Sequence, residues 1–467
     1  MKYHIITLGC PKNSVDSEGM DGILSTQGHT PVAEFAAADV VIVNTCSFIA
    51  AARDETLEVL RTLGTAKTAG QRLIAAGCMA ESHSDLVQAV PGVDATLSTR
   101  HWMRIGELVG GAVAQAVPAG QPERNIPLLD LQPVAGNGNA VQVPDQPLPD
   151  REGYADWRTA PIRRTQQGPS AYLKISDGCN LRCAFCTIPS FKGDMRSKAV
   201  GAVLGEAQEL AAQGVHEIIL IAQHLTDYGR DLGMQDGLAT LLEELCGVLP
   251  SNTWLRLMYA YPHGITPRLI EVMAQHSQIC AYLDMPLQHA HPDTLRRMRR
   301  PSDTERTKAT IRALREAMPD IALRSTFIVG FPGETNREFR ALLAFLEDVQ
   351  FDRVGAFQYS QEPGTPAATL PGQVAPRIIE RRRHELMQLQ QEISLARNQQ
   401  WQGRTLDVIV EGEGVTDDGQ VLLVGRSFRD APEVDGQVFV WGAAPVGARI
   451  QAHILHAAEY DLWGEIR

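Results

Sequence analysis

Three cysteines stand close together near the middle of the chain, in the segment KISDGCNLRCAFCTIP. Cys179, Cys183 and Cys186 have the spacing C-x3-C-x2-C. Three thiolates cannot complete a four-ligand structural zinc site by themselves, but they can hold a [4Fe–4S] cluster whose fourth iron stays open to a small chelating molecule. The alternative is a zinc knuckle that takes a distant histidine as its fourth ligand. We favour the cluster.

A second set of cysteines is spread over the first part of the chain. Cys10 follows IITLG, Cys46 follows VIVNT and Cys78 follows LIAAG, so each comes directly after an apolar run. The carboxyl ends of parallel strands form the edge where α/β sheets bind ligands. We therefore expect these thiols to hold a second [4Fe–4S] cluster with one open iron. The alternative is buried core thiols, which is the interpretation that we adopt for Cys246 and Cys280.

The N-terminal region that must position the second set is expected to be an α/β domain. Over residues 1–114, short runs rich in Val and Ile alternate with helical stretches, which is typical of buried parallel strands. We expect a flavodoxin-like fold there. Residues 115–164 are rich in Pro, Gly, Gln and Asn and have no periodicity, so they are interpreted as a linker or excursion.

Residues 165–395 are predicted to form a partial (β/α)6 barrel, because strand and helix patterns alternate six times. The expected strands are AYLKIS, EIILIAQ, WLRLMYA, CAYLDMPL, LRSTFIVG and RVGAFQYS. Such a barrel has its site at the carboxyl ends of its strands. The middle cysteines follow the first strand, which places them at that end. Six good strands make a closed eight-stranded barrel a poorer interpretation.

The last region, 396–467, has short alternating strands with Gly-rich turns, which predicts a small antiparallel β-barrel. The expected strands are TLDVIVEG, QVLLVGRS, GQVFVWG and GARIQAHILHA. A helix over 378–400 would join it to the preceding domain. Residues 397–467 hold six Arg, no Lys and eleven Asp or Glu, a net charge of −5. Such a barrel would repel an RNA backbone and attract a basic protein, although acidity can also serve solubility alone.

The composition of the whole chain indicates a soluble globular protein. Hydrophobic residues make up 44%, charged residues 21%, and the net charge is −12. No apolar run approaches the ~20 residues of a membrane span, and the N-terminus is interpreted as a first strand rather than a signal peptide. We expect a cytoplasmic protein without a membrane partner. In that reducing compartment the eight cysteines stay thiols.

The motif C-x3-C-x-aromatic-C, with Phe185 as the aromatic residue, resembles the radical S-adenosylmethionine superfamily. The resemblance implies that the open iron binds S-adenosylmethionine and that one electron releases a 5′-deoxyadenosyl radical. It also implies cofactor contacts at Phe185 itself and at Gln223 after the second strand. Further contacts are implied at Ile328, Gly330 and Gly333 in TFIVGFPGET. The alternative for these positions is turn glycines and a strand-end amide. No catalytic residue beyond the cluster ligands is predicted.

Over nearly its whole length the chain resembles the methylthiotransferases, in which a three-cysteine domain, a radical barrel and a TRAM barrel follow one another. The resemblance implies that one S-adenosylmethionine donates a methyl group to sulfur and a second supplies the radical. LGCPKNSVDSEGM and DMPLQHAHPDTLRRMRRP resemble the type that modifies the β-carbon of an aspartate in ribosomal protein S-twelve. The type that modifies transfer RNA usually has Gln where Pro11 stands. The segment of about 116–160 is longer than the family usually carries.

Partners and competing functions follow from the same resemblance. We expect ribosomal protein S-twelve as substrate, a flavodoxin or ferredoxin as reductant, and a monomer. The RRMRR run has two interpretations, a weak RNA contact and the solvated helix face that we favour. Its arginines are Arg296, Arg297, Arg299 and Arg300. The competing functions are a transfer RNA adenosine methylthiotransferase and a non-enzymatic iron–sulfur carrier.

Overall fold

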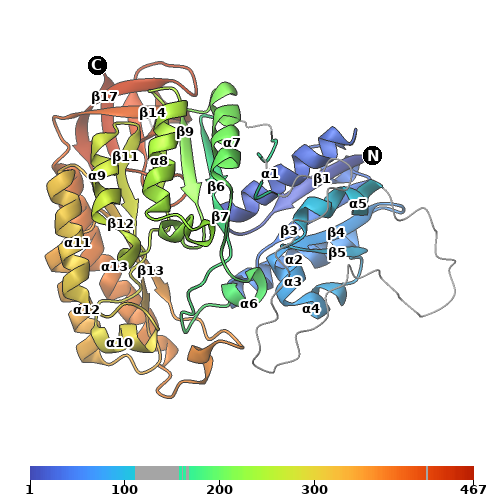
Figure 1. Cartoon of the computed structure of the whole chain (residues 1–467), viewed down its shortest axis with the longest axis horizontal. Helices are drawn as coiled ribbons and strands as arrows, with labels where there is room; N and C mark the ends of the chain where they lie inside the picture. The colour runs from blue at the N-terminus through green and yellow to red at the C-terminus, as the bar shows by residue number, and fades with distance from the viewer. Residues whose placement is uncertain (111–156, 160, 165–167, 417–418) are drawn as a thin grey trace. The chain divides into compact units, whose positions relative to one another are not determined.

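The computed structural model describes residues 1–110, 157–159, 161–164, 168–416 and 419–467 (Figure 1). The predicted linker over 115–164 lies for the most part outside these residues. The chain divides into two compact units. The first comprises Met1–Thr165 with Ser190–Lys192, and the second comprises Gln166–Pro189 with Gly193–Arg467. No helix among the described residues is both long enough and apolar enough to cross a membrane.

The first unit is built on a five-stranded parallel sheet with the order β2-β1-β3-β4-β5, which is the flavodoxin-like order. Its strands are β1 Lys2–Thr7, β2 Thr30–Pro31, β3 Val40–Thr45, β4 Arg72–Gly77 and β5 Ala95–Ser98. Its helices are α1 Pro11–Thr26, α2 Ala50–Ala66, α3 Cys78–Ser82, α4 Ser84–Gln88 and α5 Ile105–Gly110, with short 3-10 turns η1 Phe35–Ala37 and η2 Trp102–Arg104. Strand β3 is buried along its whole length, which explains its continuous apolar run. The expected α/β fold is confirmed.

The second unit begins with a six-stranded sheet of parallel strands, ordered β13-β12-β11-β10-β9-β6. Its strands are β6 Ser170–Lys174, β9 Glu217–Ile221, β10 Trp254–Leu257, β11 Ile279–Asp284, β12 Ala322–Val329 and β13 Arg353–Gln358. The sheet stays open between β6 and β13, and neighbours in space are neighbours in sequence. The expected partial (β/α)6 barrel is confirmed.

Helices follow the barrel strands and bury one apolar face each against the sheet (Figure 1). The longer ones are α7 Val200–Ala212, α8 Gly237–Val248, α9 Pro267–Gln275, α11 Thr304–Ala317, α12 Asn336–Val349 and α13 Pro376–Gln399. Short helices and 3-10 turns lie in the connections, namely α6 Ile188–Lys192, α10 Pro292–Arg297, η3 Leu225–Asp227, η4 Arg230–Leu232, η5 Pro262–Gly264 and η6 Pro366–Thr369. Two short strands, β7 Ser176–Asp177 and β8 Arg196–Ser197, pair antiparallel beside the sheet.

The C-terminal strands close into a small barrel of order β14-β15-β16-β18-β17. They are β14 Thr405–Val415, β15 Val421–Ser427, β16 Val438–Trp441, β17 Arg449–Ala457 and β18 Leu462–Ile466. All pairs are antiparallel except β16 with β18, which run parallel. The predicted small barrel is confirmed. Strand β18, which closes it, was absent from the predicted set.

A buried group of charges fixes the C-terminal barrel to the six-stranded sheet within the second unit. The carboxylate of Glu217 accepts hydrogen bonds from Arg256 and from Arg426, each at 2.6 Å. Arg353 pairs with Asp430 at 2.8 Å. Because Glu217 and Arg353 are the first residues of β9 and β13, these contacts lie at the amino ends of the strands. The carboxyl ends stay available for the cysteine loop.

Candidate active site

The loop that carries the middle cysteines is held at its base by the β7–β8 pair. Gly178 directly follows β7 and has φ = +82°. A Cβ there would lie 2.3 Å from the carbonyl oxygen of Asp194, so only glycine fits. The amide of Cys179 donates to the carbonyl of Gly193 at 3.1 Å. The two ends of the loop are therefore tied together on either side of the cysteines.

Cys179, Cys183 and Cys186 are free thiols gathered in this loop, the first two buried and the third half-buried. Burial raises the pKa of Cys186 to about 12, and the neighbouring Cys183 and Cys179 raise it further. Burial also raises the pKa of Cys179, with Cys183 again contributing. The loop therefore brings Cys183 within electrostatic reach of Cys179 and Cys186. Their role as ligands stays a prediction.

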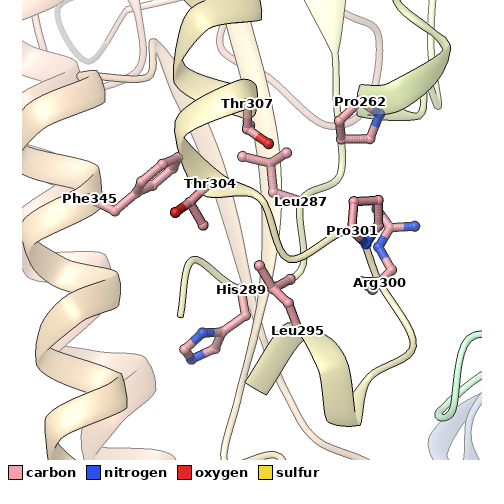
Figure 2. Close-up of a pocket in the computed structure, with 9 residues that line it drawn as sticks. All are labelled: Pro262, Leu287, His289, Leu295, Arg300, Pro301, Thr304, Thr307 and Phe345. Carbon is pink, nitrogen blue, oxygen red and sulfur yellow. The ribbon is translucent and has the colours of Figure 1, made fainter. Parts of the chain in front are cut away.

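Arg300 places a positive charge beside this group. Its Nη1 lies 3.9 Å from Sγ of Cys183, and its guanidinium stacks over the ring of Tyr261, 4.3 Å from the centroid. The Nη2 group donates to the carbonyl of Pro286. Nε is buried and has no hydrogen-bond partner among the described residues. Figure 2 shows Arg300 on one side of a small pocket, with Phe345 on the other.

The position of Arg300 corrects one interpretation of the RRMRR run. Arg296 and Arg299 are exposed, as a solvated helix face requires. Helix α10 ends at Arg297, however, and Arg299 has φ = +56°. This left-handed residue turns the chain back, so Arg300 points at the cysteine loop instead of at solvent. Helical periodicity could not show the reversal.

Two of the predicted cofactor positions lie together, and a third offers a polar atom. Phe185 and Ile328 pack against one buried cluster that includes Phe331. Gln223 donates from Nε2 to a carboxylate oxygen of Asp177 at 2.7 Å. Its Oε1 is buried without a hydrogen-bond partner among the described residues. An unpaired buried acceptor of this kind fits a site that a polar ligand completes.

The two glycines of the TFIVGFPGET motif both have φ = +78°, which favours glycine over other residues. A Cβ on Gly330 would lie 2.4 Å from the side chain of Ile379 in α13. A Cβ on Gly333 would lie 3.3 Å from Nε of Arg297. The close approach at Gly330 is therefore made by helix α13. A cofactor contact at either glycine stays a prediction.

His224 is a buried residue of this end of the barrel that the sequence did not single out. It follows Gln223, and its ring lies edge-on to Tyr261 with 4.9 Å between centroids. Neither ring nitrogen has a hydrogen-bond partner among the described residues, and Nδ1 is 3.8 Å from Asp227. Burial lowers the pKa of His224 to about 4. The imidazole is therefore neutral at pH 7.

The three N-terminal cysteines lie at one edge of the first unit's sheet. They follow β1, β3 and β4, which are neighbours in the sheet. A Cβ on Gly9 would lie 2.7 Å from Sγ of Cys46. Burial raises the pKa of Cys46, and the neighbouring thiol of Cys10 raises it further. The thiol of Cys78 lies 3.7 Å from Oδ1 of Asn13. The structure thus brings this set together.

The spacing within each cysteine set bears on which metal it suits. Among the described residues, the group whose ligand atoms all lie within 4.8 Å of one another is His291, Asp293 and Glu338. Neither cysteine set is that compact. A single zinc ion with Zn–S bonds of about 2.3 Å would need its sulfurs about 4 Å apart, and neither set is arranged in that way. Glu338 in the compact group already pairs with Arg297 at 2.9 Å.

Three family models match successive parts of the chain. Residues 2–98 match the uncharacterized protein family UPF0004, residues 173–346 match the radical SAM superfamily, and residues 403–466 match the TRAM domain. These ranges fall within the flavodoxin-like unit, the six-stranded sheet and the C-terminal barrel. The cysteine sets therefore occur in two different matched regions.

The fold is similar to that of a solved radical S-adenosylmethionine enzyme. The methyltransferase TsrM from Kitasatospora setae, with cobalamin and a [4Fe–4S] cluster bound, has a TM-score of 0.55 and 18% sequence identity. The match covers 78% of this chain and 76% of that chain. A second TsrM structure, with tryptophan and a cofactor analogue, has a TM-score of 0.54. At this identity the likeness shows the fold alone.

Much closer relatives share the whole length of the chain, and each is called ribosomal protein uS12 methylthiotransferase RimO. The protein of Roseiflexus castenholzii is 69% identical, over 100% of this chain and 96% of its own length. The protein of Chloroflexus aurantiacus is 68% identical, over 100% and 99%. The protein of Desulforamulus reducens is 41% identical, over 99% and 98%. This chain therefore belongs to the family of ribosomal protein uS12 methylthiotransferases of the RimO type.

Proposed function

We propose that this enzyme inserts a methylthio group at the β-carbon of an aspartate in ribosomal protein uS12. S-adenosylmethionine serves both as methyl donor and as source of the radical. The observation that carries the proposal is the pair of three-cysteine sets, each gathered in a separate unit of a chain that is 69% identical to a RimO relative over its full length. Two sets allow one cluster for radical formation and one for sulfur.

We assign Cys179, Cys183 and Cys186 to the first cluster and Cys10, Cys46 and Cys78 to the second. The residues fit such groups, because all six are free thiols and three thiolates leave one iron open. When bound, such a cluster would supply the one electron needed to split S-adenosylmethionine into methionine and a 5′-deoxyadenosyl radical. A radical suits this substrate, since a β-carbon beside a carboxylate is too weak an acid for a side-chain base.

The protein's own residues prepare the first site. Burial raises the pKa of Cys179 and Cys186, and the cation of Arg300 opposes that rise. Arg300 therefore favours the thiolate form that metal binding requires. Gln223 offers Oε1 as an acceptor for the cofactor's amino group. Phe185 and Ile328 supply an apolar wall that would exclude water from the radical. Gly330 and Gly333 are proposed to lie on the adenine side.

The charge of the C-terminal barrel supports a basic protein over RNA as substrate. Residues 397–467 carry six Arg and eleven acidic residues, so 6 − 11 = −5. Arg426 and Arg429 are buried and pair with buried acids of the six-stranded sheet. The acid Asp430 is buried as well, and so is the side chain of Asp435, so burial removes two charges of each sign and the excess of acids remains. That excess would attract a basic ribosomal protein. We place this reaction in the cytoplasm, with a flavodoxin or ferredoxin as reductant.

Mass spectrometry of two substrates tests the proposal. A deletion strain should yield ribosomal protein uS12 that lacks the added methylthio mass, and the wild-type gene should restore it. Transfer RNA from the same strain should keep its modifications. An unmodified transfer RNA together with a modified ribosomal protein would assign the chain to the transfer RNA type.

Anaerobic reconstitution separates the enzyme from a cluster carrier. With dithionite and S-adenosylmethionine, the wild-type chain should release 5′-deoxyadenosine, and a chain with Cys179→Ala, Cys183→Ala and Cys186→Ala should release none. Replacement of Cys10, Cys46 and Cys78 by Ala should remove about half of the bound iron. No 5′-deoxyadenosine from the wild type would leave the carrier as the better assignment.

A further inference from the structure

We infer that Asn13 is a positioning residue that holds the three cysteine-bearing loops of the first unit in place for cluster binding. The inference rests on the proposed second cluster, on Cys10, Cys46 and Cys78. Asn13 is the third residue of α1 and is only 1% exposed. It lies one helical turn from Cys10, yet its side chain reaches all three loops.

The side chain of Asn13 contacts one atom in each loop. Its Nδ2 donates to the carbonyl of Leu8, at 2.8 Å, and to the carbonyl of Thr45, at 3.0 Å. Leu8 lies two residues before Cys10, and Thr45 lies directly before Cys46. The thiol of Cys78 donates to Oδ1 over 3.7 Å. Both N–H donors and the oxygen acceptor of the amide are therefore bonded to segments that carry cysteines.

The backbone of Asn13 adds two further ties. Its N–H donates to the carbonyl of Cys10 at 2.8 Å, and its carbonyl accepts from Nδ2 of Asn44 at 2.8 Å. Asn44 is the next-to-last residue of β3, just before Thr45 and Cys46. One residue thus links the ends of β1 and β3 to the start of α3 through five hydrogen bonds.

An amide is the side chain that this position requires. Aspartate has no N–H to donate, so its oxygens would face the carbonyl oxygens of Leu8 and Thr45 without a hydrogen bond. It would also add a negative charge beside three thiolates. Alanine would leave the two carbonyls unpaired. The contact with Cys78 needs the thiol proton, which passes to solvent when metal binds. The two carbonyl bonds persist, so Asn13 keeps the loops placed before and after loading.

The first test measures the second cluster alone. In a chain with Cys179→Ala, Cys183→Ala and Cys186→Ala, reconstituted iron reports only on the first unit. Asn13→Ala and Asn13→Asp should lower bound iron several-fold and weaken its electron paramagnetic resonance signal after reduction. Gln71→Ala is the matched control. Gln71 is also buried in the first unit and donates its amide to two carbonyls, those of Phe35 and Ala38. It directly precedes β4, at the strand end opposite to Cys78. This variant should retain its iron.

The second test needs no metal and uses the full, metal-free chain. An aromatic disulfide reagent should label Cys46 and Cys78 about tenfold faster in the Asn13 variants, because two hydrogen bonds that hold the loops are lost. Circular dichroism should give the Asn13→Ala and Gln71→Ala chains similar unfolding midpoints. Wild-type labelling rates with wild-type iron would overturn the inference. If even the parent chain binds no iron in the first unit, the second cluster of the proposed function fails, while the labelling rates still decide the role of Asn13.

Discussion

Nη1 of Arg300 lies 3.9 Å from Sγ of Cys183, in the loop that carries the three middle cysteines. A charged donor beside a cluster sulfur stabilises the reduced cluster, because reduction adds negative charge there. We expect Arg300→Gln to lower the reduction potential of the first cluster by about 60 mV, the equivalent of a tenfold change for one electron. A redox titration followed by electron paramagnetic resonance would measure it.

Two controls make the Arg300 experiment specific. Arg300→Lys keeps the charge and should shift the potential less than Arg300→Gln. Arg296→Gln removes an exposed arginine of the same run and should leave the potential unchanged. Equal potentials for wild type and Arg300→Gln would show that the arginine only supports the pocket beside Tyr261.

The buried carboxylate of Glu217 depends on two arginines for its charge. Burial would raise its pKa, but Arg256 and Arg426 outweigh that effect and lower it to about 2. Arg426→Met leaves Glu217 with one partner in a fully buried site, so we expect a loss of about 3–5 kcal/mol of unfolding free energy. Urea unfolding at pH 7 would measure the loss.

The ion pair of Glu217 and Arg426 also predicts how the free energy of unfolding responds to acid, and that a second substitution restores part of the loss. Because the folded pKa of Glu217 is below its usual 4.5, its contribution is complete above pH 4.5 and fades as the pH falls toward 2. Adding Glu217→Gln to Arg426→Met should recover part of the loss. Arg268→Met, which breaks an exposed ion pair with Glu243, should cost at most about 1 kcal/mol. An Arg426→Met variant as stable as Arg268→Met would show that the buried group does not hold the barrel.

The sequence predicted the strands and the cysteine sets because both depend on local order. Buried parallel strands such as β3 are continuous apolar runs, and a cysteine after each run must reach the same edge of the sheet. Strand β18 was missed because LWGEI is short and contains a glycine. A Cβ on Gly464 would lie 2.4 Å from the carbonyl oxygen of His453. The glycine is needed because the neighbouring strand packs closely there. Five residues contain too little pattern to predict that packing.

Arg300 and Asn13 could not be assigned from the sequence for a different reason. Each side chain makes its contact with a segment that is far away along the chain. Arg300 meets Cys183 across 117 residues, and Asn13 meets Cys78 across 65. The run RRMRR predicts charge, and LGCPKNSVDSEGM carries a family resemblance. Neither predicts which neighbour the folded chain will bring to the side chain.

Gly330 is expected to tolerate no side chain, because two effects combine there. Its φ of +78° disfavours other residues, and a Cβ would lie 2.4 Å from Ile379 of α13. Gly233 has a similar φ of +74° but open space around it. Gly330→Ala should therefore cost about 1–3 kcal/mol more unfolding free energy than Gly233→Ala. Similar losses for the two variants would mean that Ile379 moves aside freely.

His224 should make the metal-free chain sensitive to mild acid. Its folded pKa of about 4, lowered mainly by burial, lies below the usual 6.5. Between these values the unfolded chain binds a proton that the folded chain does not, so stability falls as the pH drops below 6.5. From pH 7 to pH 5 the loss should be about 2 kcal/mol. His224→Gln should remove it.

Urea unfolding of the metal-free chain at pH 7 and pH 5 would measure this effect, and both pH values lie above the range in which the contribution of Glu217 changes. His384→Gln replaces an exposed histidine of α13 and should keep the wild-type response to acid. If His224→Gln loses as much stability as the wild type between the two pH values, the imidazole takes up its proton in the folded state. His224 would then carry a charge beside Arg300 at pH 5, and the neutral ring that we place next to Gln223 would not exist.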